Sequence, residues 1–200
     1  ISFSDSLVNG SMKHFRTLCY ELSKRERKIK WNGQFIIRNK RSFDDNDFDN
    51  LANSGCTGLT LGIESGSESV RNHMKKKFSN DDLDYFIHNL GKRNIKMKFL
   101  LIAGYPTETT DDFKQTIDML YKFKKYSNIT EVSPHMMLID KNTPLDYNHR
   151  DLYDDYGFHW ISNTSDYGIR YERFKEIFKV GHSCGYGFKK HALDKIEKFA

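Results

Sequence analysis

Short apolar runs alternate with capped, amphipathic helical segments along most of this chain, and this alternation constrains the fold more than any other feature. Apolar runs occupy residues 31–38, 59–63, 95–103 and 132–139, and helical patterns separate them. Strands that alternate with helices form parallel sheets through right-handed crossovers. We therefore expect an α/β fold in which the parallel strands form an open sheet or curl into a partial barrel.

The helical segments carry start signals and one apolar face each. Helices are expected from Ser11 to about residue 22, from residues 42–45 to Gly55, after Ser67, from Ser79 to Gly91, and from Thr109 or Thr110 to residue 123. The run Phe99-Leu100-Leu101-Ile102 is too continuous for a half-solvated edge strand and is typical of a buried parallel strand. Residues 1–3 are expected to form the end of a further strand.

From Asn142 onward the pattern changes to loops rich in Asp, Asn and Tyr, with helices expected over residues 171–180 and 192–199. We therefore divide the chain into a partial barrel, residues 1–145, and a mostly helical and irregular C-terminal extension, residues 146–200. A cap over the barrel mouth, a partner surface and a part of a neighbouring domain all remain open as roles for the extension.

The charge and cysteine content restrict the class of protein. The net charge of +5 is dispersed, and the lysines at 75–77 and at 122, 124 and 125 lie near expected helix ends, where solvent and the helix dipole suit them. This pattern does not indicate nucleic-acid binding. Cys19, Cys56 and Cys184 are too widely spaced for a C-x-x-C or C-x-x-x-C-x-x-C motif, and their odd number argues against a secreted disulfide framework. No apolar run approaches the roughly 20 residues of a membrane span. A cytoplasmic protein with no membrane partner is expected.

Unusual chemistry gathers where the expected strands end, which is where parallel sheets bind ligands. The segment Gly62-Ile63-Glu64-Ser65-Gly66-Ser67 places a carboxylate and hydroxyls after a strand, and Gly66 permits a ligand or another backbone to approach closely. Glu64 suits the vicinal hydroxyls of a ribose, because a charged acceptor makes stronger hydrogen bonds than a neutral one. The alternative reading of the serines is a turn with a helix cap.

A second segment, residues 100–109, combines a strand, a tight turn and a capped helix. Backbone groups of Ile102, Ala103 and Gly104 would be exposed at the strand end and suit the edge of an adenine base, with Tyr105 available for stacking. The alternative is an ordinary β/α turn that contains Gly and Pro.

Together the two segments resemble the radical S-adenosylmethionine (SAM) superfamily, particularly the branch with G-I-E-S-G-S followed by G-[FY]-P-x-E-T. Order and spacing both match, and the resemblance extends from residue 1 to about residue 145. It implies a partial (β/α) TIM-like barrel and an enzyme that cleaves SAM reductively at a 4Fe-4S cluster, giving a 5′-deoxyadenosyl radical that abstracts hydrogen from a substrate.

The resemblance also implies roles for individual residues. Glu64 and Ser65 would bind the SAM ribose, the backbone of Ile102, Ala103 and Gly104 the adenine, and Asp5 would lie near the methionyl end. Arg38 would face the SAM carboxylate or the substrate, or would pair with Asp44 or Asp45.

The chain departs from the family in lacking the C-x-x-x-C-x-x-C loop, so we expect the cluster ligands outside this chain and no activity from it alone. Members of the resembled branch often carry cobalamin in an upstream domain. The alternatives are a non-catalytic barrel that binds a partner, favoured by a start codon near residue 1, and a β/α enzyme with a phosphate-binding mouth. An exposed sheet edge at residues 1–3 would favour a homodimer. The substrate is not identified by the sequence.

Overall fold

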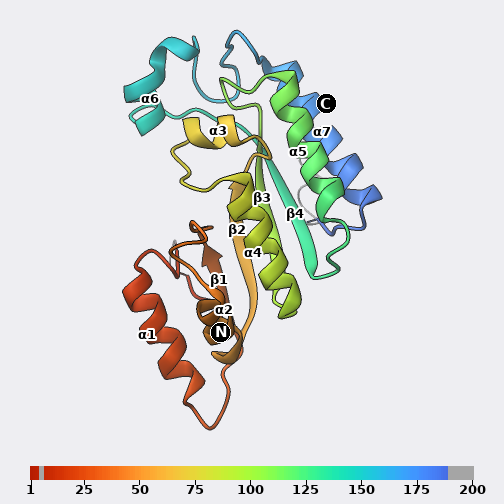
Figure 1. The fold of residues 1–200 in the computed structure, drawn as a ribbon. Coiled ribbons are helices and arrows are strands. Elements are labelled where there is room, and N and C mark those ends of the chain that lie inside the picture. Colours follow the sequence, from red (N-terminus) through yellow and green to blue (C-terminus); the bar gives the residue numbers. More distant parts are fainter. Residues whose placement is uncertain (5–6, 189–200) are drawn as a thin grey trace. The chain divides into compact units, whose positions relative to one another are not determined.

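The computed structural model describes residues 1–4 and 7–188, and in this part of the chain four strands form one sheet in the order β1-β2-β3-β4 (Figure 1). The strands are β1 (Trp31–Phe35), β2 (Cys56–Glu64), β3 (Lys96–Ala103) and β4 (Ile129–Met136). They are parallel, and strands that follow one another in the chain are neighbours in the sheet. Sequential order is the arrangement of β/α barrels, so the expected α/β class is confirmed.

Side-chain caps fix where most helices of the barrel region begin. These helices are α1 (Met12–Ser23), α2 (Asp45–Asn53), α3 (Glu68–His73), α4 (Asn80–Lys92) and α5 (Thr110–Phe123). Asp44, Ser67, Ser79 and Thr109 each accept a hydrogen bond from a backbone N–H in the first turn of the following helix. Three of these caps are reciprocal capping boxes, which satisfy two otherwise unpaired backbone donors. The helix starts predicted from sequence are therefore confirmed to within a few residues.

Some expected boundaries were wrong. β4 begins at Ile129 and ends at Met136, three residues earlier at each end than the run from which it was predicted. Its polar first half is held by neighbours, because Thr130 donates to the Met97 carbonyl and Glu131 pairs with Lys98 at 2.7 Å. Apolar content alone does not reveal such pairing.

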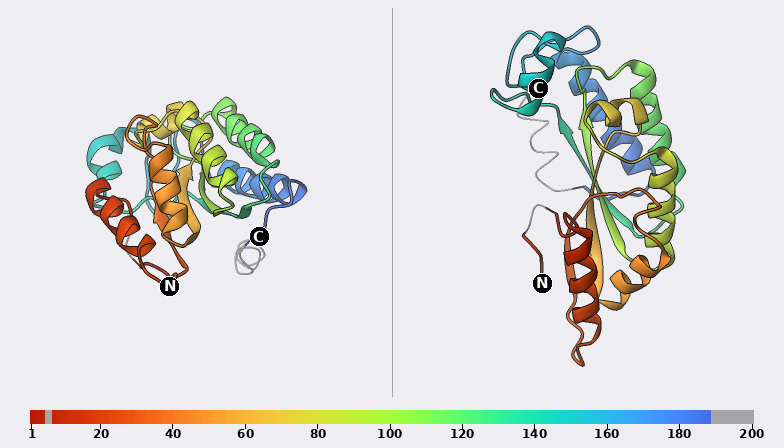
Figure 2. Two further views of the ribbon diagram at one scale, coloured as in Figure 1. Left: turned by 60° about the horizontal axis from the view of Figure 1, so that its bottom comes forward. Right: turned by 60° about the vertical axis from the view of Figure 1, so that its left-hand side comes forward.

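The chain forms two compact units, and the first contains residues 1–63, 77–100 and 125–132. Its core holds a cluster of phenylalanine rings with centroid separations of 4.6–6.0 Å, formed by Phe15, Phe35, Phe43, Phe48 and Phe86. Helix α1 packs against α2 (Figure 2). Residues 1–3 pair with Asn32 of β1 through two backbone hydrogen bonds and a parallel bridge, in agreement with the expected strand end.

The second unit contains residues 64–76, 101–124 and 133–200. Its last twelve residues, and with them the helix expected at 192–199, lie outside the described residues. It includes α6 (Pro144–His149), the 3-10 turn η1 (Arg150–Leu152) and α7 (Tyr167–Ser183), which starts four residues before its predicted position. Helices α5 and α7 lie side by side (Figure 2). Trp160 is fully buried, and the Arg170 guanidinium lies 3.7 Å from its ring centroid.

The helices of residues 1–4 and 7–188 include none with the length and apolar character needed to cross a membrane.

Candidate functional site

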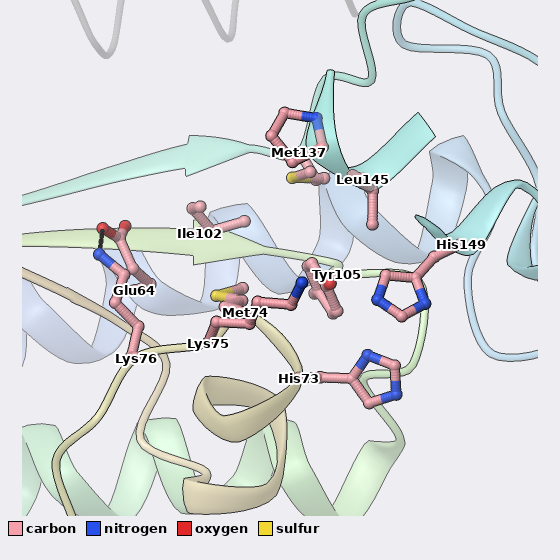
Figure 3. A pocket seen from close by; sticks show the side chains of 11 residues that line it. Glu64, His73, Met74, Lys75, Lys76, Ile102, Tyr105, Met137, Leu145 and His149 are labelled. Carbon is pink, nitrogen blue, oxygen red and sulfur yellow. Dashed lines mark hydrogen bonds and ion pairs between the residues drawn. The ribbon is translucent and has the colours of Figure 1, made fainter. Parts of the chain in front are cut away.

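A pocket of about 260 Å³ lies within the second unit, beside the C-terminal ends of β2, β3 and β4. Its volume is slightly below that of typical small-molecule sites, which span about 300–1,000 Å³. Figure 3 shows the side chains that line it, and they come from four separate parts of the chain. They are Glu64, His73, Met74, Lys75, Lys76, Ile102, Tyr105, Met137, Pro144, Leu145 and His149.

Glu64, the last residue of β2, supplies the carboxylate of this pocket. Its backbone is left-handed, with φ of 68°, a conformation that costs a non-glycine residue about 1–3 kcal/mol. The carboxylate accepts a hydrogen bond from the Lys76 ammonium at 2.7 Å (Figure 3), and its side chain is 16% exposed. The strained backbone and the ion pair together fix a charged acceptor at the strand end.

The wall next to Glu64 is apolar. Ile102 of β3, Met74 and Met137 present their side chains to the same cavity, and Leu145 of α6 extends this surface. A charged acceptor beside an apolar surface matches the chemistry of a nucleoside, which has a ribose diol and a flat base. The Glu64 acceptor and the apolar contacts of this pocket therefore suit the nucleoside moiety of SAM.

Ser65 and Gly66 serve the protein interior in this structure. The Ser65 hydroxyl shares a 3.3 Å hydrogen bond with Thr116 of α5 and accepts another from the Ser67 backbone N–H at 3.1 Å. A Cβ at Gly66 would lie 2.4 Å from the Gln115 carbonyl oxygen. Gly66 was predicted to permit the close approach of a ligand or of another backbone. The structure shows the approach of a backbone, that of α5.

The backbone after β3 is also held from within. The Ala103 carbonyl accepts from the Met137 N–H at 3.0 Å, and the Gly104 N–H donates to the buried Glu108 carboxylate at 2.9 Å. Gly104 has φ of 84°, and a Cβ there would lie 2.1 Å from Cγ of Arg170, so both the turn and its packing require glycine. Ile102 faces the cavity, whereas Ala103 and Gly104 line its supporting turn. The adenine role of these three residues stays a prediction.

Glu108 connects this turn to the C-terminal region. Its carboxylate accepts from Arg173 of α7 at 3.0 Å as well as from Gly104, and only 1% of its side chain is exposed. Burial raises the pKa of the Glu108 carboxyl to about 7, against the lowering effect of Arg173 and the Gly104 N–H. This residue thereby ties α7 to the turn at the end of β3.

Arg38 belongs to the first unit, where its guanidinium donates to the backbone carbonyls of Asn9 and Gly10. Among the described contacts it forms no ion pair with Asp44 or Asp45, so that alternative was wrong. Asp5 lies outside the described residues, and its predicted place near the methionyl end is neither supported nor contradicted.

Cys19 and Cys56 do not suit an iron-sulfur cluster. Burial raises the pKa of the Cys19 thiol to about 11 and that of Cys56 to about 12, whereas cluster ligands are thiolates. In the part of the chain that the structure describes, no three His, Cys, Asp or Glu side chains are grouped to hold a metal ion. Cys56 is a buried core residue.

Sequence reasoning missed several residues of the pocket. Lys76 was assigned to a solvated face, but it pairs with Glu64. His73, at the end of α3, and His149, at the end of α6, were not singled out, although they line the pocket together. They are 76 positions apart and belong to no recognisable motif, so only folding reveals their proximity.

Comparison with known proteins identifies the family. The radical SAM superfamily model matches residues 11–120. An uncharacterized Methanocaldococcus jannaschii protein is 30% identical over 123 residues, 60% of this chain and 28% of that protein. A tRNA-2-methylthio-N(6)-dimethylallyladenosine synthase of Carboxydothermus hydrogenoformans is 26% identical over 106 residues, 51% of this chain and 24% of the synthase. The chain thus spans about a quarter of the length of these relatives.

Two solved structures share the fold. Coproporphyrinogen III oxidase (HemN) of Escherichia coli, described as a radical SAM enzyme, aligns over 88% of this chain and 38% of its own with a TM-score of 0.62 and 13% identity. The radical SAM methyltransferase TsrM of Kitasatospora setae, solved with cobalamin and a [4Fe-4S] cluster, aligns over 72% of this chain and 27% of its own with a TM-score of 0.58 and 19% identity. Because the family model matches more than half of the residues of this chain, the chain belongs to the radical SAM superfamily.

Proposed function

We propose that this chain is the SAM-binding part of a radical SAM enzyme. The observation that carries the proposal is Glu64, a carboxylate held in a left-handed backbone conformation at the end of β2, paired with Lys76 and facing an apolar pocket. Family membership supports the assignment of the pocket to SAM. The activity, substrate and partners of these relatives belong to proteins of which this chain matches only about a quarter, so they are not assigned to this chain.

In this proposal Glu64 accepts hydrogen bonds from the two ribose hydroxyls. Lys76 orients the carboxylate through their ion pair of 2.7 Å. Ile102 and the neighbouring methionines exclude water from the base and cover its face. In radical SAM enzymes, bound SAM supplies the 5′-deoxyadenosyl radical that abstracts hydrogen from the substrate.

The cluster ligands, in this proposal, lie outside the chain, because the sequence has no C-x-x-x-C-x-x-C loop and burial raises the pKa of the Cys19 and Cys56 thiols. The chain is then inactive by itself and binds SAM through its nucleoside moiety. The expectation of cobalamin rests on the resemblance alone and stays a prediction, as do the homodimer and the division of the chain at residue 145.

Calorimetric titration of SAM into the 200-residue chain tests the proposal. We expect saturable binding that Glu64→Gln weakens about ten- to a hundredfold, because a hydrogen bond to a charged group contributes about 1.5–3 kcal/mol. Glu131→Gln is the matched control, since Glu131 also pairs with a lysine at 2.7 Å but lies in the first unit. Absence of SAM binding to a cluster-reconstituted longer form, or equal losses in both variants, would contradict the proposal.

A further inference from the structure

A second polar group lies in the same unit, at the end of the pocket away from the Glu64–Lys76 pair (Figure 3). His73 ends α3, Lys75 follows two residues later, His149 ends α6, and Tyr105 follows β3. His73, Lys75 and His149 also line an adjoining cavity of about 690 Å³. These three side chains therefore form the wall that the two cavities share.

The four side chains converge without internal partners. The imidazoles of His73 and His149 have ring centroids 5.1 Å apart, and the Tyr105 ring lies 6.0 Å from that of His73. Figure 3 shows the Lys75 ammonium pointing toward the Tyr105 ring, next to the two imidazoles. Among the described residues, none of these four side chains forms a hydrogen bond or an ion pair.

The acidic groups nearby do not satisfy these donors. Glu64 is engaged by Lys76, and Glu68 of α3 lines only the outer cavity and has an interaction of its own. Lys75 has a left-handed backbone, with φ of 58°, and Glu64 has the same kind of strained conformation. These two charged side chains of the pocket therefore extend from strained backbone positions. His73 and Lys75 are exposed and His149 is half-buried, so a ligand that brings oxygen acceptors can reach these converging donors.

From this convergence we propose that His73, Lys75, Tyr105 and His149 bind a phosphate monoester group of the substrate. The proposal rests on the function proposed above, since it names the substrate class for the same pocket. A terminal phosphate offers three strong acceptor oxygens to four donors, whereas a carboxylate offers two. A metal ion fits less well, because the Lys75 ammonium repels a cation and the described residues form no group of three metal ligands.

Histidine ring NMR resonances of the isotopically labelled 200-residue chain provide the test. Inorganic phosphate, added at constant ionic strength, is expected to shift the His73 and His149 signals saturably and to leave the exposed His14 of the first unit unchanged. Lys75→Met should weaken binding at least about tenfold, because it removes a charge-assisted hydrogen bond. Lys77→Met is the matched control, since Lys77 is also exposed but lines neither cavity.

Three further ligands define the chemistry. Acetate is expected to bind at least about tenfold more weakly than phosphate, and phenyl phosphate more tightly than a dinucleotide, whose phosphodiester has only two free oxygens. The proposal is overturned if no saturable shift occurs, if His14 shifts equally, if Lys77→Met is as damaging as Lys75→Met, or if acetate or the dinucleotide binds best. A SAM titration of the same samples separates the two proposals, because loss of phosphate binding alone leaves the SAM assignment intact.

Discussion

Replacing Glu108 by glutamine tests how burial controls the carboxyl group at the β3–α5 turn. The Glu108 side chain is 1% exposed, and one of its oxygens accepts from both Gly104 and Arg173 while the other has no hydrogen-bond partner among the described residues. Glutamine retains an acceptor for the Gly104 N–H and resembles the protonated acid. The substitution therefore removes the ionisation and keeps the shape.

The structure sets the sign and size of the effect. The Glu108 pKa rises from 4.5 to about 7 on folding, mainly because burial disfavours the charged form. Between these pH values the folded protein binds more protons than the unfolded chain, so this group's contribution to stability is fully present below pH 4.5 and is lost as pH rises through 7. At about 1.36 kcal/mol per pKa unit, the loss amounts to about 3 kcal/mol.

Urea unfolding of the parent and of Glu108→Gln, measured from pH 4.5 to pH 8, isolates this contribution as the difference between the two free energies of unfolding. We expect the parent to lose about 3 kcal/mol relative to the variant across that range. Arg173→Met should move the loss to higher pH, because Arg173 lowers the pKa of the Glu108 carboxyl. A difference that does not vary with pH, or one that grows in the opposite direction, would refute the reasoning.

Two substitutions test the packing of the units. Gly66→Ala should destabilise the protein by about 1–3 kcal/mol, because the added Cβ meets the α5 backbone. Gly10→Ala, with no neighbour nearer than 3.6 Å to the added Cβ, should have little effect. Equal urea midpoints for the two variants would contradict this expectation. Phe86→Ala, in the centre of the aromatic cluster, should lower the free energy of unfolding by about 3–5 kcal/mol. Tyr121→Ala, at a half-exposed position, should lower it much less. Similar losses at both positions in urea unfolding would show that the cluster adds no stability.

The order and type of most elements followed from local rules. Ser67, Ser79 and Thr109 start helices because their side chains satisfy backbone donors within the same turn, which depends only on nearby sequence. Boundaries such as that of β4 did not follow, because the polar residues at its start are stabilised by the neighbouring strand. Ser65 illustrates the same limit, since one partner of its hydroxyl, Thr116, is 51 positions away.

By itself, the sequence determined the alternation of strands and helices, the placing of Glu64 at a strand end, and the resemblance that the family match confirmed. These depend on periodicity, caps and short motifs, all of which act over a few residues. The tertiary structure decided that Lys76 neutralises Glu64 and that His73 and His149 meet across the pocket. Such contacts join segments that are separate in the chain, and they form only when the burial of the apolar core brings those segments together.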